Sequence, residues 1–194
     1  MRTYYDRRAS EYDDWWLGRG LYADRLRPGW DEEREALERA IASLPPRRTL
    51  DVACGTGFLT RHLPGEVVGL DASARMLEVA RGQAPSADFV QGDALALPFD
   101  DGAFERVFTS YFYCHLEDDE RERFLAEATR VAPELVVVAS LRGEGDPLER
   151  WEERRLRDGS TWTVYKRVFE GDDLADELGG KVVFKGDWFV VVRA

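Results

Sequence analysis

The sequence predicts an α/β protein with a doubly wound, mostly parallel sheet that ends in an antiparallel hairpin. Two observations predict this fold class. From residue 31 to residue 140, five strand-like apolar runs are interleaved with amphipathic helical patterns. Beyond residue 140, two further strand-like runs lie too close together for a crossover helix, so they must be antiparallel. The 194 residues are enough for one domain with a sizeable core.

Each element has its own local signal. Residues 2–27 are rich in Tyr, Trp and Arg and stop at Pro28-Gly29. Apolar residues at helical spacing predict a helix over 31–44, which Pro45-Pro46 ends. The other predicted elements up to residue 140 are strands at 49–52, 67–70, 88–91, 104–110 and 134–140, and helices from about Phe58, over 74–82, and from an Asp118-Asp119 cap to about Val131.

The last fifty residues predict two hairpins. Asp158-Gly159 is a strong turn signal between the strand-like runs 154–157 and 160–169. A short helix is expected at 172–178. Strands at 181–185 and 188–193 follow, joined by Gly186-Asp187, and should pair at the edge of the sheet.

Composition and charge exclude several classes of protein. The sequence has no run of about 18 apolar residues and no apolar segment at its start, so we expect neither a membrane span nor a secretory signal and place the protein in the cytoplasm. Two cysteines form neither a disulfide framework nor a zinc set, and we expect no metal. The net charge of −11 argues against nucleic acid as a partner and favours a small molecule.

The run from Leu50 to Thr60 carries the main functional signal. An apolar strand ends there in a Gly-Thr-Gly turn, and glycine lets a ligand approach the backbone closely. The amides of a helix that begins after the turn would face an anionic group. The next strand ends in Asp71, 20 positions after Asp51, where a ribose-binding carboxylate belongs. We therefore predict a nucleotide-type ligand at this turn.

Three motifs occur in order along the chain: LDVACGTG, VVGLDAS and VQGDALALPFDDGAFERVFTSYFYCHL. Together they resemble the motifs of class I S-adenosylmethionine-dependent methyltransferases, in the small-molecule branch that includes the ubiquinone/menaquinone-biosynthesis type. The resemblance covers nearly the whole chain. It implies a Rossmann-like seven-stranded sheet within a single methyltransferase domain over 1–194, with S-adenosyl-L-methionine as cofactor and S-adenosyl-L-homocysteine as product.

The resemblance also implies which residues bind the cofactor. Asp71 would accept hydrogen bonds from both ribose hydroxyls, and Asp93 would accept one from the adenine amine. Asp51 would anchor the turn or meet the ammonium group through water. Asp93 could instead be an ordinary turn residue, and Met76 could belong to the core. The full set of expected cofactor contacts in the motifs is Asp51, Gly55, Thr56, Gly57, Asp71, Ala72, Met76, Asp93, Ala94 and Ser110.

Acceptor recognition is expected outside the sheet, in a lid formed by residues 1–27 and a substrate-side hairpin within 141–170. Tyr5, Arg8, Tyr12 and Trp16 fall close to one helical stripe. The resemblance places Tyr5 and Arg8 near the carboxylate of the cofactor, and the alternative is that the stripe packs on the core. The expected substrate contacts are Tyr12, Trp16, Tyr111 and Tyr165.

The predicted function is transfer of a methyl group to a small-molecule acceptor by in-line displacement, with positioning as the main catalytic effect. His115 is the candidate catalytic base, although it could also be a packed or capping histidine. One alternative is a non-catalytic S-adenosylmethionine-binding or scaffold protein. A nucleotide-binding oxidoreductase is disfavoured because Thr60 stands where the third glycine of its motif would be. A monomer and a homodimer are both compatible with the sequence.

Overall fold

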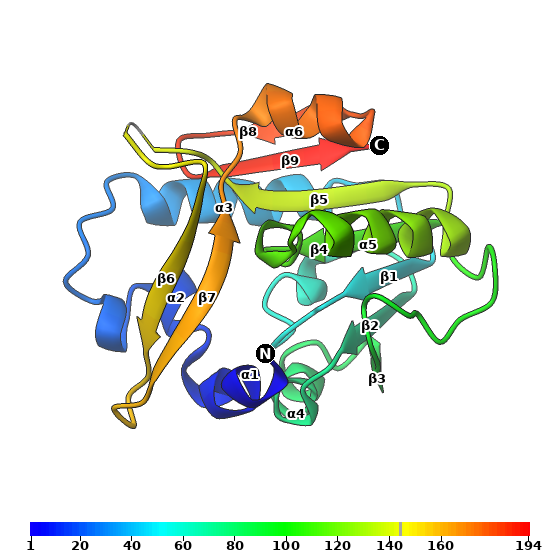
Figure 1. Ribbon diagram of the computed structural model, residues 1–194. Coiled ribbons are helices and arrows are strands. Elements are labelled where there is room, and N and C mark those ends of the chain that lie inside the picture. Colours follow the sequence, from blue (N-terminus) through cyan, green and yellow to red (C-terminus); the bar gives the residue numbers. More distant parts are fainter. Residues whose placement is uncertain (144) are drawn as a thin grey trace.

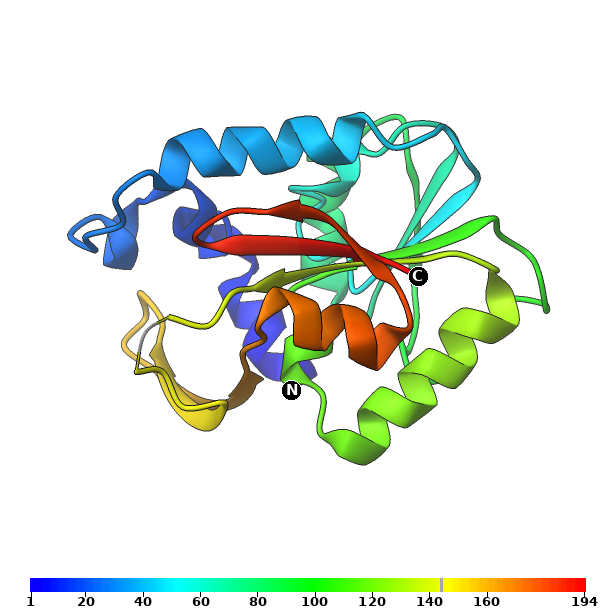
Figure 2. The ribbon, with the colours of Figure 1, turned by 90° about the horizontal axis from the view of Figure 1, so that it is seen from above.

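The protein is a seven-stranded sheet with helices on both faces (Figure 1), seen here in a computed structural model that describes residues 1–143 and 145–194. The strand order is β3-β2-β1-β4-β5-β9-β8. β1 to β5 run parallel, and β9 is antiparallel to both of its neighbours. Viewed from above, α3 covers one face of the sheet, and α5 and α6 cover the other (Figure 2). The predicted fold class is confirmed.

The helices and strands have the following bounds. The helices are α1 (Arg2–Arg8), α2 (Asp14–Leu17), α3 (Trp30–Ala42), α4 (Ala74–Gln83), α5 (Asp118–Val131) and α6 (Gly171–Leu178), with 3-10 turns at Ala9–Glu11, Gly20–Tyr22, Thr60–His62 and Tyr113–His115. The strands are β1 (Thr49–Val52), β2 (Val67–Asp71), β3 (Asp88–Gln91), β4 (Arg106–Ser110), β5 (Leu135–Ser140), β6 (Glu149–Arg155), β7 (Thr161–Arg167), β8 (Lys181–Lys185) and β9 (Phe189–Arg193).

Two local predictions are wrong. The expected helix from Phe58 is a single 3-10 turn at Thr60–His62, because Pro64 follows too soon for a second helical turn to form. The amides of a long helix N-terminus are therefore not present at the glycine turn. The cap of α5 is Glu117 rather than the Asp118-Asp119 pair, since Glu117 forms a reciprocal capping box with Glu120.

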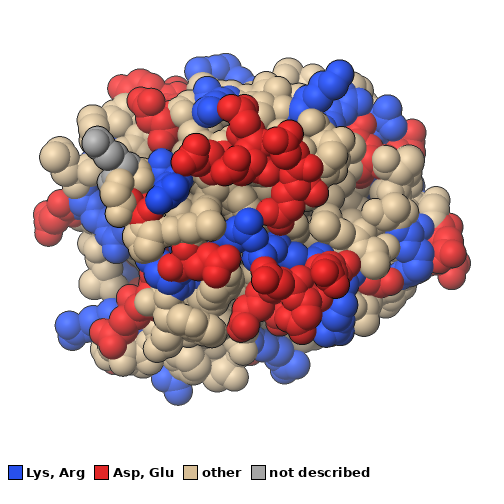
Figure 3. All heavy atoms as spheres, turned by 45° about the horizontal axis from the view of Figure 1, so that its top comes forward, with Lys and Arg blue, Asp and Glu red and all other residues tan. Residues whose placement is uncertain are grey.

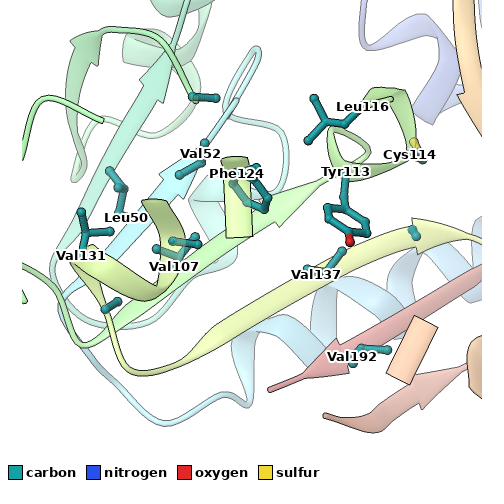
Figure 4. Packing of buried hydrophobic residues seen from close by; sticks show 14 of the residues in the cluster. Leu50, Val52, Val107, Tyr113, Cys114, Leu116, Phe124, Val131, Val137 and Val192 are labelled. Carbon is teal, nitrogen blue, oxygen red and sulfur yellow. The ribbon is translucent and has the colours of Figure 1, made fainter. Parts of the chain in front are cut away.

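Buried side chains form a separate core on each face of the sheet. On one face, Phe124 of α5 packs against Val107 and Val137 of the central strands (Figure 4). On the other face, Trp16 and Trp30 join α2 and α3 to the sheet. The central strands are buried on both faces, as their continuous apolar runs predict.

The N-terminal segment, residues 1–27, connects the sheet to the β6–β7 hairpin, which forms a two-stranded sheet of its own. Tyr4 of α1 is buried against Leu156 and Val164 of the hairpin in a third, small cluster. The amide of Arg157 donates to Glu11 at 3.0 Å. On its other side, the segment is held by the Thr56 hydroxyl, as described below.

Candidate functional site

The carboxyl ends of the parallel strands β1, β2, β3 and β4 meet at one edge of the sheet, and a cavity of about 220 Å³ lies there. Open α/β sheets bind ligands at this edge. The residues that follow the strands form the floor of the cavity, and the N-terminal segment closes it. The predicted cofactor contacts that line the cavity are Tyr5, Gly55, Asp71, Ala72, Met76, Asp93, Ala94 and Ser110.

The two glycines of the turn have different surroundings. Gly55 has a φ of +56° and faces the cavity, where a Cβ would lie 3.7 Å from the ring of Tyr12. Gly57 has a φ of +77°, and a Cβ there would lie 3.2 Å from Ala80 of α4. Gly55 is thus the residue that gives a ligand access to the backbone. Gly57 instead allows α4 to pack closely against the turn.

Asp71 holds the glycine turn and keeps acceptor capacity for a ligand. Its Oδ2 accepts the amide of Gly55 at 2.9 Å, and its Oδ1 accepts the amide of Ser73 at 2.8 Å. Burial raises the pKa of this carboxyl, against the opposing effect of the two amides. Each carboxylate oxygen can accept a second hydrogen bond, so a diol in the cavity can be bound by both oxygens.

Asp51 lies beneath the turn, and no atom of it lines the cavity. Its Oδ2 accepts the hydroxyl of Thr60 at 2.6 Å, which anchors the turn. Its Oδ1 is buried and has no hydrogen-bond partner among the described residues. Burial and, to a smaller extent, the nearby Asp71 carboxylate raise the pKa of Asp51 to about 7, against the opposing effect of the hydrogen bond from Thr60. The site thus holds an under-satisfied acidic group beside the ligand cavity, which favours a positively charged ligand group.

Asp93 is a turn residue and Met76 is a core residue, the alternatives to ligand binding given above, and both also border the cavity. The Oδ1 atom of Asp93 accepts the amide of Leu95 at 2.9 Å, which is an ordinary turn contact. Met76, on α4, is fully buried under the cavity floor. Ser73 caps α4 by accepting the amide of Met76 at 3.1 Å, which fixes the backbone that carries the Met76 side chain.

Four residues connect this cavity to a second, smaller hollow of about 30 Å³: Tyr5, Tyr12, Tyr111 and His115. Tyr111 follows β4 and has a φ of +55°, a conformation that is strained for a bulky residue. Such strain concentrates at functional sites. The hydroxyl of Tyr111 is buried and has no hydrogen-bond partner among the described residues.

His115 lies at the same junction in a fixed tautomer. Its Nδ1 lies 2.6 Å from the carbonyl oxygen of Tyr165, and because a carbonyl can only accept, Nδ1 carries the proton. Nε2 is then a hydrogen-bond acceptor. Burial and, to a smaller extent, the nearby cation of Arg154 lower the pKa of His115 to about 3. The ring is therefore neutral at physiological pH.

Six predicted site residues do not line the 220 Å³ cavity: Asp51 and Gly57, described above, and Arg8, Thr56, Trp16 and Tyr165. Arg8 lines the smaller hollow instead. Thr56 is fully buried and donates to Asp13 of the N-terminal segment at 2.6 Å. Trp16 is in the core, stacked on Phe58 at 4.9 Å between ring centroids. The Tyr165 ring packs against Trp151 at 5.5 Å, and its backbone carbonyl, not its side chain, touches the site through His115.

Sequence reasoning missed three residues of the smaller hollow: Trp15, Arg154 and Lys166. Arg154 and Lys166 come from the two strands of the β6–β7 hairpin. A signal was present, because charged residues recur at every second position through Arg150, Glu152 and Arg154, which places them on one face of a strand. The same residues continue into a larger pocket of about 600 Å³ that opens beyond the hollow.

No group of three or more His, Cys, Asp or Glu side chains is arranged to hold a metal ion within the part of the chain described. None of the described helices has the length and apolar character needed to cross a membrane.

Comparisons with known proteins identify relatives of the chain. Residues 49–134 match a family model described as a methyltransferase domain. The demethylmenaquinone methyltransferase of Thermotoga maritima is 34% identical over 133 residues, which cover 66% of this chain and 54% of that protein. The corresponding enzyme of Thermus thermophilus is 42% identical over 107 residues, which cover 50% of this chain and 47% of that protein. The chain thus spans about half the length of the curated relatives it matches.

Solved structures extend the likeness to nearly the whole chain. A DhpI-SAM-HEP complex has a TM-score of 0.75 and 27% identity, covering 98% of this chain and 94% of that one. A DhpI-SAH complex has a TM-score of 0.72 and 28% identity, covering 98% and 92%. The N-terminal segment and the β6–β7 hairpin therefore lie within the region of structural similarity.

Proposed function

The chain belongs to the class I S-adenosylmethionine-dependent methyltransferases, and from this premise we propose that it transfers a methyl group from S-adenosyl-L-methionine to a small-molecule acceptor. The observation that carries the proposal is the cavity at the ends of β1 to β4, into which Asp71 and Asp93 bring their carboxylates from neighbouring strands. Two carboxylates from neighbouring strands that border one cavity suit a nucleoside, whose ribose and adenine both present hydrogen-bond donors.

The residues of the cavity fit this cofactor. The buried Oδ1 of Asp51 has no partner among the described residues, and a cationic ligand group nearby would compensate its charge. The open approach to Gly55 leaves room for a ligand at the turn. The apolar side chains of Met76 and Leu95 border the same cavity and suit an aromatic base.

Each part of the cofactor has a binding partner in this proposal. Asp71 binds the ribose hydroxyls, while Asp93 and the Ala94 amide bind the edge of the adenine ring. The backbone at Gly55 and Ala72 borders the rest of the nucleoside, and Tyr5 closes the cavity from the N-terminal segment. When bound, the cofactor supplies a methyl group on a sulfonium, whose departing sulfur becomes a neutral thioether.

The residues at the junction orient the acceptor. They would direct a lone pair of the acceptor toward the methyl group that the cofactor would supply. Tyr111 and His115 border both the cofactor cavity and the smaller hollow, so they lie where the two ligands meet. Nε2 of His115 can accept a hydrogen bond from an acceptor O–H or N–H and so direct its lone pair.

The proposed organisation is a single methyltransferase domain over 1–194. Residues 1–27 act as its lid and the hairpin within 141–170 as the second wall of the acceptor site. The aromatic residues Tyr12 and Tyr111 line this enclosed space, which suits a small molecule better than a nucleic-acid backbone. The protein acts as a monomer or a homodimer.

Calorimetry together with a turnover assay tests the proposal. We expect S-adenosyl-L-homocysteine to bind and NAD not to bind. Incubation with methyl-labelled S-adenosyl-L-methionine and fractionated metabolite pools should then label a small molecule. Binding without turnover in any pool would favour the non-catalytic alternative. Absence of binding by either sulfur compound would refute the proposed function.

A further inference from the structure

We propose that the methyl acceptor carries an anionic group, a carboxylate or a phosphoryl group, and that Arg8, Arg154 and Lys166 bind it between the N-terminal segment and the β6–β7 hairpin. The inference rests on the proposed function and deepens it, because it names the chemical class of the acceptor. It rests on three observations: the position of these cations, the lack of a carboxylate partner for Arg8 and Lys166 among the described residues, and the opposite charge of the rest of the protein.

The cations lie on the side of the junction away from the cofactor cavity. The smaller hollow shares Tyr5, Tyr12, Tyr111 and His115 with the cofactor cavity, and shares Trp15, Arg154 and Lys166 with the 600 Å³ pocket. The three spaces therefore adjoin in a row. If the reactive atom of the acceptor lies at His115, its remaining atoms lie in the smaller hollow. Arg8, Arg154 and Lys166 are the cationic residues that line this hollow.

Arg8 is a buried cation without a carboxylate partner. Its side chain donates to the hydroxyls of Tyr4 at 2.6 Å and Tyr22 at 3.3 Å and lies over the ring of Tyr12 at 4.8 Å. Among the residues that the structure describes, no carboxylate comes within ion-pairing distance of it, although Arg8 is only 4% exposed. Burial of an unpaired charge is unfavourable, and a bound anion would offset this cost.

Where it lines the 600 Å³ pocket, the hairpin carries four cationic and two acidic side chains. Arg150 and Lys166 are paired across the hairpin, and Arg154 lies further along the same face. One carboxylate, that of Glu152, accepts from Arg150 at 2.8 Å and from Arg154 at 2.7 Å. The side chain of Lys166 forms no hydrogen bond or ion pair with a described residue. Burial and the neighbouring arginines lower the pKa of its ammonium group, as expected where cations crowd together.

This positive charge is exceptional in the molecule. The protein has a net charge of −11, and acidic side chains cover much of the face that Figure 3 shows. The 600 Å³ pocket is nevertheless lined by five cationic and only two acidic side chains. Cations gathered in a concave site focus the electrostatic potential and attract anions. Guanidinium groups are moreover well suited to bind carboxylate or phosphoryl oxygens in pairs.

The carboxylate of the cofactor is the competing ligand for Arg8. Arg8 lines the smaller hollow, beyond the ring of Tyr12, and does not line the cofactor cavity. Lys166 and Arg154 likewise lie on the far side of the junction. The geometry therefore assigns the cluster to the acceptor, and the test must measure cofactor and anion binding separately.

The test titrates the protein, saturated with S-adenosyl-L-homocysteine, with inorganic phosphate, methylphosphonate and acetate at low ionic strength. We expect at least one of these anions to bind. K166M and R154Q should weaken that binding at least tenfold and leave the affinity for S-adenosyl-L-homocysteine within threefold of wild type. Matched controls are K181M and R123Q, which remove exposed cations outside the three spaces and should change neither affinity.

K166M is the decisive variant, since Lys166 has no described partner whose loss would disturb folding. Lack of anion binding by the wild-type protein, or equal binding by wild type and K166M, would overturn the inference. A loss of S-adenosyl-L-homocysteine affinity in K166M would also overturn it, by placing the cluster at the cofactor. If the anions bind but S-adenosyl-L-homocysteine does not, the proposed function fails while the anion site stands.

A second measurement uses turnover with paired acceptors that differ only in the anionic group, such as a carboxylic acid and its amide, or a phosphonate and the corresponding alcohol. The anionic member of a pair should be methylated at least tenfold faster, and K166M should reduce this preference. A preference for neutral acceptors would contradict the inference.

Discussion

Replacement of Asp71 by Asn separates the ligand-binding role of this carboxylate from its role in the fold. In the proposed complex, both carboxylate oxygens accept ribose hydroxyls, and a hydrogen bond to a charged group contributes about 1.5–3 kcal/mol. Asn offers one neutral acceptor oxygen instead. The expected loss is about 2–4 kcal/mol, or roughly 30- to 1000-fold in the Kd of S-adenosyl-L-homocysteine.

The stability of the fold should change much less. Asp71 accepts the amides of Gly55 and Ser73, and Asn keeps one of these contacts. Because burial raises the pKa of Asp71, its ionised form is disfavoured in the folded state, and Asn removes that cost. We expect the free energy of unfolding to change by less than about 1 kcal/mol.

Calorimetric titration and urea denaturation measure the two quantities independently. D88N is the matched control, since Asp88 is exposed at the start of β3, at the opposite end of that strand from the cavity. If D71N remains folded and its Kd for S-adenosyl-L-homocysteine lies within threefold of the wild-type value, the assignment of the ribose to this carboxylate is refuted.

Three further predictions concern the turn and the junction. The pKa of Asp51 is raised to about 7, so folding favours the protonated form of this carboxyl. The free energy of unfolding of wild type should therefore fall by roughly 4 kcal/mol relative to that of D51N as the pH rises from about 4 to 8. Urea denaturation at a series of pH values measures this difference. G57A should lower the free energy of unfolding by about 2–3 kcal/mol because of the positive φ of Gly57 and the contact with Ala80. G55A should lower it by about 1–2 kcal/mol but weaken S-adenosyl-L-homocysteine binding more than G57A does. The reverse ranking in affinity would contradict the roles given to the two glycines. H115Q should lower kcat at least tenfold and leave the cofactor affinity unchanged. Because the pKa of His115 is about 3, this ring should not cause a step in the pH profile of wild-type kcat near pH 6.5, so any step found there should persist in H115Q.

Most strands of the sheet were predictable, because short runs rich in apolar and β-branched residues between turn signals indicate strands. The predicted segments 49–52 and 88–91 match β1 and β3 residue for residue. The helix predicted from Phe58 does not form because Pro64 leaves no room for a full helix after the turn.

Most residues expected at the cofactor side line one cavity, because they follow strand ends in sequence order. The residues expected at the acceptor side do not come together in this way. The stripe through Tyr5, Arg8, Tyr12 and Trp16 assumed one continuous helix, but the chain has a 3-10 turn at Ala9–Glu11 and a new helix at Asp14–Leu17. This interruption rotates Trp16 into the core while Tyr12 stays at the cavity. Arg154 and Lys166 join Arg8 through tertiary packing that local patterns do not contain.

The small cluster of Tyr4, Leu156 and Val164 has a consequence for motion. It joins α1 to the hairpin through a core of its own, separate from the two cores that hold the sheet. Elements with a small separate core open locally at lower free energy than the global fold. We therefore expect amide hydrogens of β6, β7 and α1 to exchange together and faster than those of β1 and β4. Acceptor and cofactor could then enter and leave through one cooperative opening while the sheet stays intact.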